Sequence, residues 1–408
     1  MRLTILTFML VLSVACDRTP GQESSFAAAP VATSGASSQA PAAPATAAFP
    51  IRVEGTGFVD AEGKPFAWRG ISSFQLAEMI AHGREREAVA YLDWAKSEEL
   101  TVVRVLLMAR HLFQLTPEDG RRVLPRLLDL AKERGLAIEV VALADTKDRT
   151  LDYDAHIREV GRIALDKGNA FIEIANEPGH PTQDPRLHDA AFAKRLAELL
   201  PESLTVALGS FEYGDGYAHG DYATTHVPRG DDGWDHVFEI AGHADRGAQL
   251  KKPVVSDEPI GAGPKFDAGR RDNEPARFGA AAALTRLVGM TATFHYEGGL
   301  YSRIPVGPEA ESLAAWKAGL ALVGNTGGSG EFLRQEAMNR LARIEDTGRA
   351  YARVTSEEAT ILLVNPGASP SIAWQAEWKE IRRATAPGVL LVQARANQKG
   401  TELAVGSW

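Results

Sequence analysis

The chain has 408 residues, of which 45% are hydrophobic, and a formal net charge of −9 with a pI near 5.7. This hydrophobic content suits one large domain or two smaller ones and excludes a chain that is disordered throughout. The acidic charge and the lack of a Lys/Arg cluster argue against a nucleic-acid partner, because proteins that bind phosphate backbones carry basic stripes.

The first 16 residues have the pattern of an export signal. Arg2 precedes an apolar run over residues 3–12, and small residues at 13–15 precede Cys16. The pattern fits the core and cleavage site of a secretory signal, and the run is too short to span a bilayer permanently. Cys16 is the only cysteine of the chain, so no intramolecular disulfide can form.

The position of Cys16 directly after Ala15 resembles a bacterial lipoprotein signal, in which the cysteine becomes the lipidated first residue. Such signals usually carry leucine where this chain has Ser13. We expect a lipid anchor at Cys16 on an exported protein; ordinary secretion with a free thiol and an incidental cysteine are the alternatives. Residues 17–48 are rich in Ala, Pro, Ser and Thr and are expected to form a flexible linker, because they lack large apolar side chains.

A hairpin is predicted at residues 51–66, where polar and apolar residues alternate around turn residues 60–65, and we expect it to cover one end of the domain that follows. Strand and helix patterns then alternate. The predicted strands are at residues 67–74, 101–108, 136–143, 171–176, 204–210, 223–227, 253–257 and 290–295. The predicted helices are near residues 84–98, 118–134, 154–168, 187–200, 234–250, 272–287 and 308–324.

Only a loop at residues 211–222 follows the fifth predicted strand. The pattern therefore predicts an α/β fold, a (β/α)8 TIM barrel over residues 49–328 that lacks one helix. The alternative is an open doubly wound sheet, but no glycine-rich phosphate fingerprint follows an early strand. Residues 329–408 are predicted to be one helix, at 329–347, followed by a small β-rich extension. We expect a monomer.

Two predicted strands end in a carboxylate next to a proline. Glu177 follows Asn176 at the end of one strand, and Glu258 ends another, 81 residues later. In a barrel the catalytic groups lie at the carboxyl ends of the strands, and two such glutamates are the minimal set for cleaving a glycosidic bond. A solvated charge where a strand meets its loop is the other interpretation of each glutamate taken alone.

Polar residues at other strand ends extend this site. Arg104 interrupts an apolar strand, where a guanidinium would keep a nearby carboxylate ionised, or would pair with a structural acid. His226 closes the sixth strand and His295 the eighth, and either histidine could equally be structural. No histidine pair has the spacing of a zinc helix, and no cysteine cluster exists, so we expect neither a metal nor another cofactor.

Aromatic side chains in the predicted loops could stack on the apolar faces of sugar rings. Tyr296 lies in the loop after the eighth strand, and Trp234 begins the helix after the sixth. Four more aromatic residues lie in the loop after the fifth strand, and these are Phe211, Tyr213, Tyr217 and Tyr222. Packing within the loops is the alternative for any one of them.

Several motifs, taken in order, resemble the clan A retaining glycoside hydrolases, and most closely the family 5 cellulase and mannanase type. They are GFVDAEGKPF at 57–66, WRGI at 68–71, VRV at 103–105, IANEP at 174–178 and the strand-end Glu258. The resemblance covers roughly residues 51–325, and IANEP is its most specific part. The chain departs from the family pattern in three places. It lacks the tyrosine that is usual two residues after His226, and residues 294–296 lack the usual tryptophan. Around Glu258 it reads SDEP at 256–259, where Thr or Gly before the glutamate and Phe or Trp after it are usual.

The resemblance implies a role for each matching residue. Glu177 would be the general acid/base and Glu258 the nucleophile of a double displacement. Asn176 would donate to the sugar 2-hydroxyl, Arg104 would steady the nucleophile, and His226 would match the histidine of strand six. The implied partner is a poly- or oligosaccharide. A carbohydrate-binding barrel without hydrolysis and a surface lipoprotein that scaffolds protein contacts are the alternatives.

Overall fold

The computed structural model describes residues 47–110, 112–147, 151–227, 233–258, 274–324, 328 and 330–397. The predictions for the export signal, for Cys16 and for the linker up to residue 46 lie outside these residues. Among the described residues, no helix has both the length and the apolar character needed to cross a membrane.

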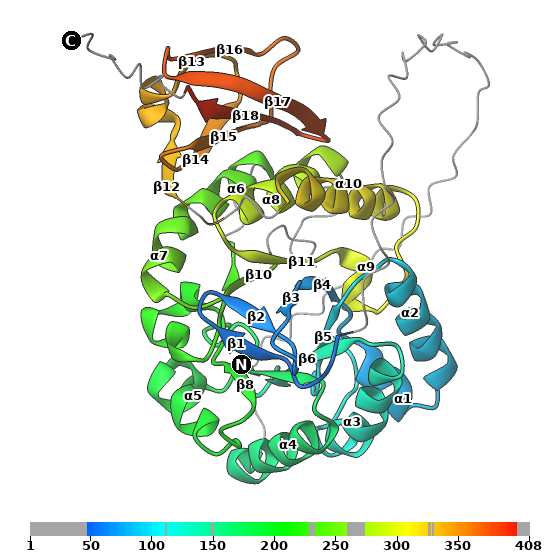
Figure 1. The fold of residues 1–408 in the computed structure, drawn as a ribbon. Coiled ribbons are helices and arrows are strands. Elements are labelled where there is room, and N and C mark those ends of the chain that lie inside the picture. Colours follow the sequence, from blue (N-terminus) through cyan, green and yellow to red (C-terminus); the bar gives the residue numbers. More distant parts are fainter. Residues whose placement is uncertain are drawn as a thin grey trace, which may run out of the picture. The chain divides into compact units, whose positions relative to one another are not determined.

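An eight-stranded parallel sheet forms the centre of the chain (Figure 1). Its strands are β4 (Arg69–Ser72), β5 (Val102–Leu106), β6 (Ala137–Leu143), β7 (Ala170–Ala175), β8 (Thr205–Ala207), β9 (Ala223–His226), β10 (Val254–Glu258) and β11 (Thr291–Phe294). The strand order is β8-β7-β6-β5-β4-β11-β10-β9, and a parallel bridge between Ser210 and Thr224 brings β8 and β9 together. All eight predicted barrel strands are confirmed.

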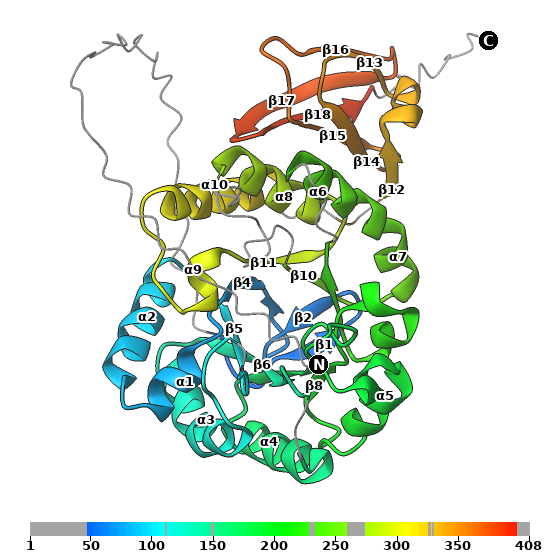
Figure 2. The same ribbon diagram turned by 180° about the vertical axis from the view of Figure 1, so that it is seen from behind.

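Helices lie around the sheet, as the view from behind in Figure 2 also shows. They are α1 (Leu76–Ala81), α2 (Glu85–Ser97), α3 (Pro117–Lys132), α4 (Tyr153–Lys167), α5 (Ala190–Ala197), α6 (Gly233–Glu239), α7 (His243–Leu250), α8 (Pro275–Leu287), α9 (Glu297–Leu300) and α10 (Pro308–Val323). Every residue between β8 and β9 is described, and this connection holds two 3₁₀ helices, η2 (Phe211–Tyr213) and η3 (Asp215–His219), but no α-helix. The fold is therefore the predicted (β/α)8 barrel with one helix missing.

Local sequence explains where these elements begin and end. All seven residues of β6 are buried, which fits a near-continuous apolar run that is covered on both faces. Helix α3 begins after Thr116, whose hydroxyl accepts the backbone N–H of Asp119 at 3.1 Å, and Pro117 occupies its first turn. Helix α4 ends at Gly168, whose φ of 78° is a left-handed conformation that favours glycine.

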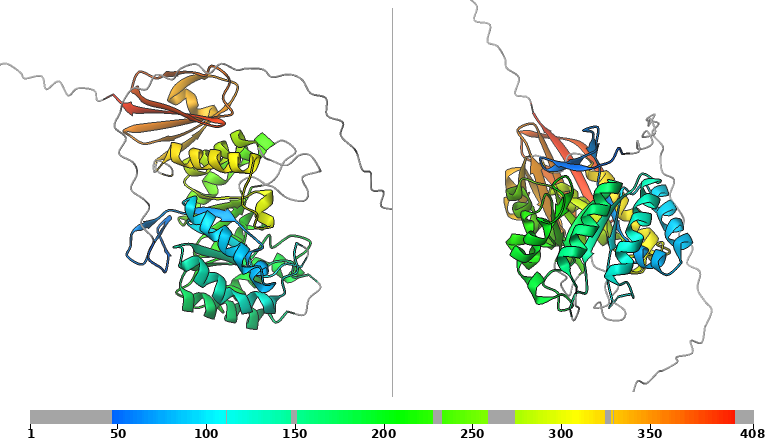
Figure 3. Two further views of the ribbon diagram at one scale, coloured as in Figure 1. Left: turned by 90° about the vertical axis from the view of Figure 1, so that its right-hand side faces the viewer. Right: turned by 90° about the horizontal axis from the view of Figure 1, so that it is seen from below.

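The amino-terminal segment covers one end of the barrel, as predicted (Figure 3). It forms three short antiparallel strands, β1 (Arg52–Glu54), β2 (Gly57–Val59) and β3 (Pro65–Phe66), where a single hairpin was expected. Phe58 packs against Trp68, Phe171 and Tyr222, with ring centroids 5.1–5.8 Å apart. This aromatic cluster closes the barrel at the end opposite the carboxyl ends of the strands.

The carboxyl-terminal region is β-rich, as expected, but the helix predicted at 329–347 is wrong. Its strands are β12 (Glu331–Arg334), β13 (Ala342–Glu345), β14 (Arg349–Val354), β15 (Glu358–Val364), β16 (Ser371–Trp374), β17 (Trp378–Ala386) and β18 (Val389–Ala396). The segment predicted to be this helix instead forms β12, the 3₁₀ helix η5 (Gln335–Arg340) and β13. The helix was expected from the spacing of Phe332, Met338, Leu341 and Ile344. In the structure β12 pairs with β14 and β13 pairs with β16, and Met338 and Leu341 are buried in a small core between these strands.

The β-rich region packs on α8 of the barrel. The guanidinium of Arg353 donates from Nε to the carbonyl of Leu287 at 2.8 Å and from Nη2 to that of Val288 at 2.6 Å. These carbonyls belong to the last turn of α8 and its cap, which have no partner within the helix. Side chains of β14, β15 and β18 join the main hydrophobic core, and they are Tyr351, Leu362, Val364, Val389 and Leu391.

Candidate active site

The two predicted catalytic glutamates lie together at the carboxyl ends of two barrel strands. Glu177 follows β7 by two residues, and Glu258 is the last residue of β10. One carboxylate oxygen of each lies within 4.8 Å of the other, in a group that also includes His226. The Glu258 side chain is 5% exposed and that of Glu177 is 27% exposed, so Glu177 is the more accessible of the pair.

The backbone at Glu177 has an uncommon conformation. Its φ of 41° lies in the left-handed region, which costs a residue with a β-carbon of order 1–3 kcal/mol. The turn is held by the N–H of His180, which donates to the Glu177 carbonyl at 2.8 Å, and by Gln183, whose side-chain amide donates to the carbonyl of Asn176. Strain of this kind is typical of functional sites, where the surrounding structure fixes the direction of a side chain.

Arg104 connects Glu258, Asn176 and a buried acid, so it contacts a predicted catalytic carboxylate and also pairs with an interior acid. It is completely buried and donates from Nη1 to Glu258 Oε1 at 3.1 Å. It also donates from Nη2 to Glu173 Oε2 at 2.8 Å and to Asn176 Oδ1 at 2.9 Å. Because a guanidinium only donates, the last bond orients the Asn176 amide so that its Nδ2 hydrogens can donate to another group.

Beneath the pair lie three acids that the sequence analysis did not single out. Glu139, Glu173 and Asp257 are fully buried, with carboxylate oxygens 3.8, 2.8 and 3.3 Å from Arg104. Burial opposes the charge of Arg104, but these acids and Glu258 outweigh it and raise the pKa of Arg104 well above its usual range. The sequence signal for Glu139 and Glu173 was a single acid inside an otherwise apolar strand, since a buried charge needs a partner. Asp257 had no such signal, because it lies between Ser256 and Glu258.

Burial raises the pKa values of two acids in this cluster. Desolvation, with the nearby charges of Glu173 and Asp257, raises the pKa of Glu139 well above its usual range. Its Oε1 accepts the hydroxyl of Tyr222 at 2.8 Å. Desolvation also raises the pKa of Glu173, against the opposing effect of Arg104. The pKa rises more for Glu139 than for Glu173, because Arg104 opposes the effect of burial more strongly at Glu173.

His226 and His295 both face Glu258. His226 Nδ1 lies 3.6 Å from Glu258 and 3.8 Å from Glu177, and its Nε2 lies 3.4 Å from Asp257. Burial disfavours the charged ring, but Glu258 and Asp257 outweigh it and raise the pKa of His226 well above its usual value, so an imidazolium bridges the two glutamates. His295 Nε2 lies 3.7 Å from Glu258 Oε2, while its Nδ1 lies 2.9 Å from the hydroxyl of Ser72.

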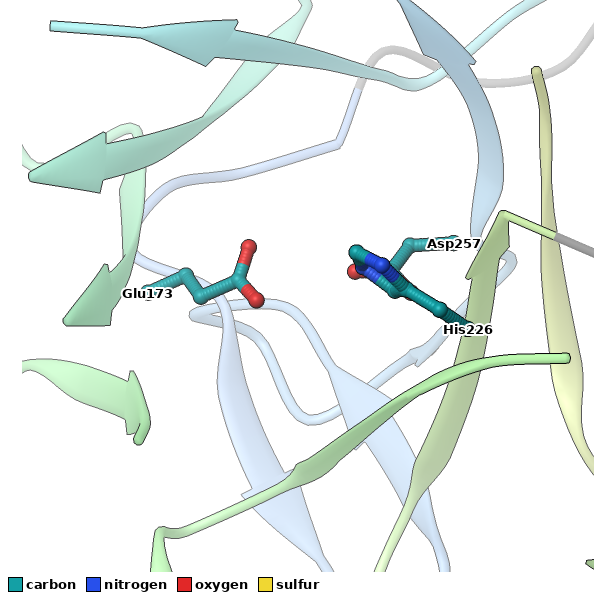
Figure 4. A group of neighbouring side chains, drawn as sticks. All are labelled: Glu173, His226 and Asp257. Carbon is teal, nitrogen blue, oxygen red and sulfur yellow. The ribbon is translucent and has the colours of Figure 1, made fainter. Parts of the chain in front are cut away.

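The cluster contains a group with metal-ligand geometry. Figure 4 shows Glu173 pointing toward His226 and Asp257, with one ligand atom of each within 4.8 Å of the others. The Arg104 guanidinium, however, lies 2.8 Å from Glu173, 3.3 Å from Asp257 and 3.5 Å from His226. A metal ion here would lie against a buried cation, so this donor set fits Arg104 better than a metal.

The remaining predicted binding residues have different surroundings. Tyr296 is 1% exposed, its ring stacks on Phe294, and its hydroxyl contacts that of Tyr91 at 3.0 Å. This burial supports a packing role, and sugar contact by Tyr296 stays a prediction. Trp234 is half-buried and stacks on Phe238 one turn along α6, with ring centroids 6.2 Å apart. A sugar-binding role for Trp234 stays a prediction.

The four aromatic residues between β8 and β9 also differ from one another. Phe211, Tyr217 and Tyr222 are at most 1% exposed, so they pack the protein interior. Tyr213 is 37% exposed, and its hydroxyl donates to Glu177 Oε1 at 3.3 Å. Sequence position alone could not separate it from its neighbours, because η2 and η3 have 3 and 5 residues and are too short to show a repeating pattern of buried residues.

No family model matches the chain, and no curated protein matches it. Among solved structures, the chain is similar to a protein from Bacteroides vulgatus ATCC 8482 described as a candidate glycoside hydrolase. The TM-score is 0.54 and the identity 11%, and the match covers 87% of this chain and 84% of that one. At this identity the similarity shows the fold alone.

Two further matches have TM-scores below 0.5 and carry no argument by themselves. One is a β-glucanase from Saccharophagus degradans in complex with cellotetraose, at a TM-score of 0.47 and 10% identity, covering 69% of this chain and 100% of that one. The other is a glycoside hydrolase family 5 mannosidase from Rhizomucor miehei, at 0.46 and 13%, covering 69% and 99%. The structural comparison therefore supports the barrel, and a function has to be argued from the site.

Proposed function

We propose that the protein is a retaining glycoside hydrolase that cleaves O-glycosidic bonds of a poly- or oligosaccharide. The observation that carries this proposal is the distance between the carboxylates of Glu177 and Glu258, whose nearest oxygens are no more than 4.8 Å apart. Retaining enzymes place the two carboxyl groups about 5–5.5 Å apart, whereas inverting enzymes need about 6.5–9.5 Å to admit a water molecule.

The surroundings of the two carboxylates support different roles for them. Glu258 accepts from Arg104 and faces His226 and His295, and these cationic or donor groups favour an ionised nucleophile. Glu177 is more accessible and can reach a leaving oxygen, first as an acid and then as the base that activates water. Glu258 would attack the anomeric carbon and release the sugar when that water attacks the glycosyl-enzyme.

The other polar residues would bind and orient the sugar. Asn176, held by Arg104, offers its amide hydrogens to a sugar hydroxyl. His226 and His295 would act mainly through Glu258, and Trp234 remains a candidate stacking surface. No step of this mechanism requires a cofactor or a metal ion.

A panel of aryl glycosides and polysaccharides tests the proposal. Turnover of at least one substrate is expected, with a product that initially keeps the anomeric configuration of the substrate, as proton NMR of the fresh reaction would show. An inverted product would contradict the retaining assignment. The second candidate is a carbohydrate-binding barrel that has lost hydrolysis, and binding of a polysaccharide without any turnover would favour it.

We also propose that the protein is exported and attached to a membrane through a lipid on Cys16. The support is the sequence pattern, in which the only cysteine stands between an apolar signal core and a polar linker. Cys16→Ala should therefore move the protein from the membrane to the soluble fraction, with unchanged melting temperature. A Cys16→Ala protein that stays with the membrane, or a wild-type protein that is secreted in soluble form, would contradict the anchor.

A further inference from the structure

The 3₁₀ helix η2, where the barrel lacks an α-helix, contacts three elements of the active-site end through three consecutive residues. The ring of Phe211 lies 5.5 Å from that of His243 in α7. The carboxylate of Glu212 accepts the backbone N–H of His226, at the end of β9, at 3.0 Å. The hydroxyl of Tyr213 donates to Glu177 Oε1 at 3.3 Å.

Glu212 fixes η2 to the barrel. Its side chain accepts the hydroxyls of Ser210 and Thr225, and it lies 3.2 Å from Nδ1 of His243. Burial alone would raise the pKa of Glu212, but His243, His226 and the two hydroxyls outweigh burial and lower it. The carboxylate is therefore ionised, and it connects η2 to both α7 and β9.

The loop after β7 is shaped to receive the Tyr213 ring. A β-carbon on Gly179 would lie 2.4 Å from Cδ1 of that ring, so glycine is needed for the ring to approach. Burial, with the charges of Glu177 and Glu258, raises the pKa of Tyr213 well above its usual value. The phenol is therefore neutral at all working pH values and can act as a hydrogen-bond donor.

We propose that Tyr213 is a positioning residue for Glu177, donating its hydroxyl to Oε1 so that the acid proton is carried by Oε2, with Glu212 holding the phenol in reach. This inference rests on the proposed function, because it assigns Tyr213 a part in the same reaction. A hydrogen bond to a carboxylate is stronger than one to a carboxylic acid. Tyr213 would therefore favour the ionised Glu177, the form that acts as base on water.

Kinetics of Tyr213→Phe test this role, with Tyr217→Phe as the matched control. Tyr217 lies in the same connection, but it is buried and donates its hydroxyl to the backbone carbonyl of Leu187. With an aryl glycoside that has a good leaving group, hydrolysis of the glycosyl-enzyme limits turnover and needs Glu177 as base, so Tyr213→Phe should lower kcat about 10-fold. With a poor leaving group, it should also move the alkaline limb of the pH–rate profile for kcat/KM to higher pH, because the carboxylate loses a donor.

The possible outcomes separate the two proposals. Wild type without turnover on any substrate would overturn the proposed hydrolysis. Active wild type with an unmoved alkaline limb in Tyr213→Phe, or with the same displacement in Tyr217→Phe, would overturn the role of Tyr213.

A second measurement does not depend on activity. In protein labelled with ¹³Cζ-tyrosine, the resonance missing from Tyr213→Phe belongs to Tyr213, among 8 tyrosines in the chain. It should shift as pH is lowered through the ionisation of Glu177, and this shift should be absent in Glu177→Gln and present in Tyr217→Phe. A Tyr213 resonance that titrates equally in Glu177→Gln would show that the hydroxyl does not report on Glu177, and the inference would fail.

Discussion

Arg104 connects Glu258 and Asn176, two residues of the proposed active site, with the buried acids. It donates to Glu258 and Asn176 at the carboxyl ends of the strands and to Glu173 in the interior of the barrel. The interior acids hold the guanidinium in place and balance its charge, so it can serve Glu258 without moving. A mutation of a buried acid is therefore expected to affect Glu258, the proposed nucleophile, through Arg104.

The asymmetry between the two glutamates gives the sharpest kinetic prediction. With an aryl glycoside whose leaving group needs no protonation, Glu177→Ala should still form the glycosyl-enzyme and hydrolyse it slowly, whereas Glu258→Ala should form none. Poor leaving groups should lose about 10²–10⁴-fold in rate with Glu177→Ala. Mass spectrometry of the trapped enzyme checks whether Glu177→Ala forms the glycosyl-enzyme. Added azide then checks that Glu258→Ala forms none, because the glycosyl azides from the two variants should have opposite anomeric configurations.

Normal turnover of the natural substrate by both variants would contradict the assignment of Glu177 and Glu258 as the catalytic pair. Circular dichroism and melting temperatures of the two variants serve as the control, since Glu258 also lies against the buried guanidinium.

Glu139 gives a prediction about stability and pH. Its pKa is raised in the folded protein, so the folded state binds more protons than the unfolded state above about pH 4.5. The free energy of unfolding therefore falls as pH rises from about 4.5 toward the pKa of Glu139 in the folded protein, by up to about 1.4 kcal/mol per pH unit. Glu139→Gln resembles the protonated side chain, so it should remove this part of the slope and be more stable than wild type at alkaline pH.

Urea unfolding between pH 5 and 9 measures the slope for wild type and Glu139→Gln. Glu118→Gln is the control, because the Glu118 side chain is 72% exposed and should leave the slope unchanged. Other buried groups titrate in both proteins, so the difference between the two curves is the relevant quantity. Parallel curves would mean that Glu139 is already ionised in the folded protein.

The sequence predicted the site only in part, for a reason of geometry. Glu177, Glu258, Asn176 and Arg104 could be found because they interrupt or end apolar strands. The partners of Arg104 depend on the stagger between strands: Arg104 pairs in register with Glu139, whereas Glu173 pairs with Val141, two residues further along β6. One sequence does not contain that stagger, so the buried acids could not be assigned to Arg104 in advance.

At the scale of elements, strands and barrel helices were predictable because each repeats a clear pattern of apolar residues. The helix expected at 329–347 failed because its expected apolar face lies on three different elements: Phe332 is on β12, Met338 and Leu341 are in η5 and at its C-cap, and Ile344 is on β13. Pairing of β12 with β14 supplies backbone hydrogen bonds that a helix would otherwise have to provide. Tertiary pairing of this kind outweighs local propensity.

The crossing of α8 and α10 depends on two glycines. A β-carbon on Gly279 would lie 2.3 Å from the carbonyl oxygen of Pro387, in the turn before β18, and one on Gly319 would lie 2.1 Å from the carbonyl oxygen of Gly279. Gly279→Ala should therefore destabilise the protein by about 1–3 kcal/mol, as overpacking does. The backbone atoms that it meets cannot rotate away.

Gly242→Ala is the matched control for this substitution. Gly242 has helical φ and ψ of −62° and −31°, and the atom nearest to its added β-carbon is Glu239 Oε2 at 3.7 Å, an ordinary contact. Thermal unfolding of both variants compares the two sites directly. Equal melting temperatures for Gly279→Ala and wild type would show that the turn before β18 can move away from α8 without cost.

At the scale of the whole molecule, two hydrophobic cores share one sheet. One face of the carboxyl-terminal sheet joins the main core through Tyr351, Leu362 and Leu391, and the other face forms a second core with Leu333 and Met338. The composition of this region could predict a β-rich extension. It could not predict that the extension packs on α8, because that contact depends on one buried arginine and on side chains far apart in sequence.

The carboxyl-terminal region should therefore stabilise the barrel and should not act as a separate sugar-binding module. Arg353→Ala removes the donors to the carbonyls of Leu287 and Val288, and each buried carbonyl left without a partner costs about 1–3 kcal/mol. Arg395→Ala is the control, because Arg395 is 63% exposed and pairs with Glu358 at the surface. Melting temperature should fall in the first variant and stay within error in the second.

Deletion of residues 330–408 extends the same test to the whole region. It removes the Arg353 contacts and also uncovers the apolar side chains of α8, so we expect a larger loss of stability or loss of soluble expression. Two measurements separate this role from sugar binding, namely the melting temperature and the affinity for insoluble polysaccharide. A truncated barrel with unchanged melting temperature and weaker polysaccharide binding would identify the region as a binding module, because only then would its loss affect the substrate and leave the fold intact.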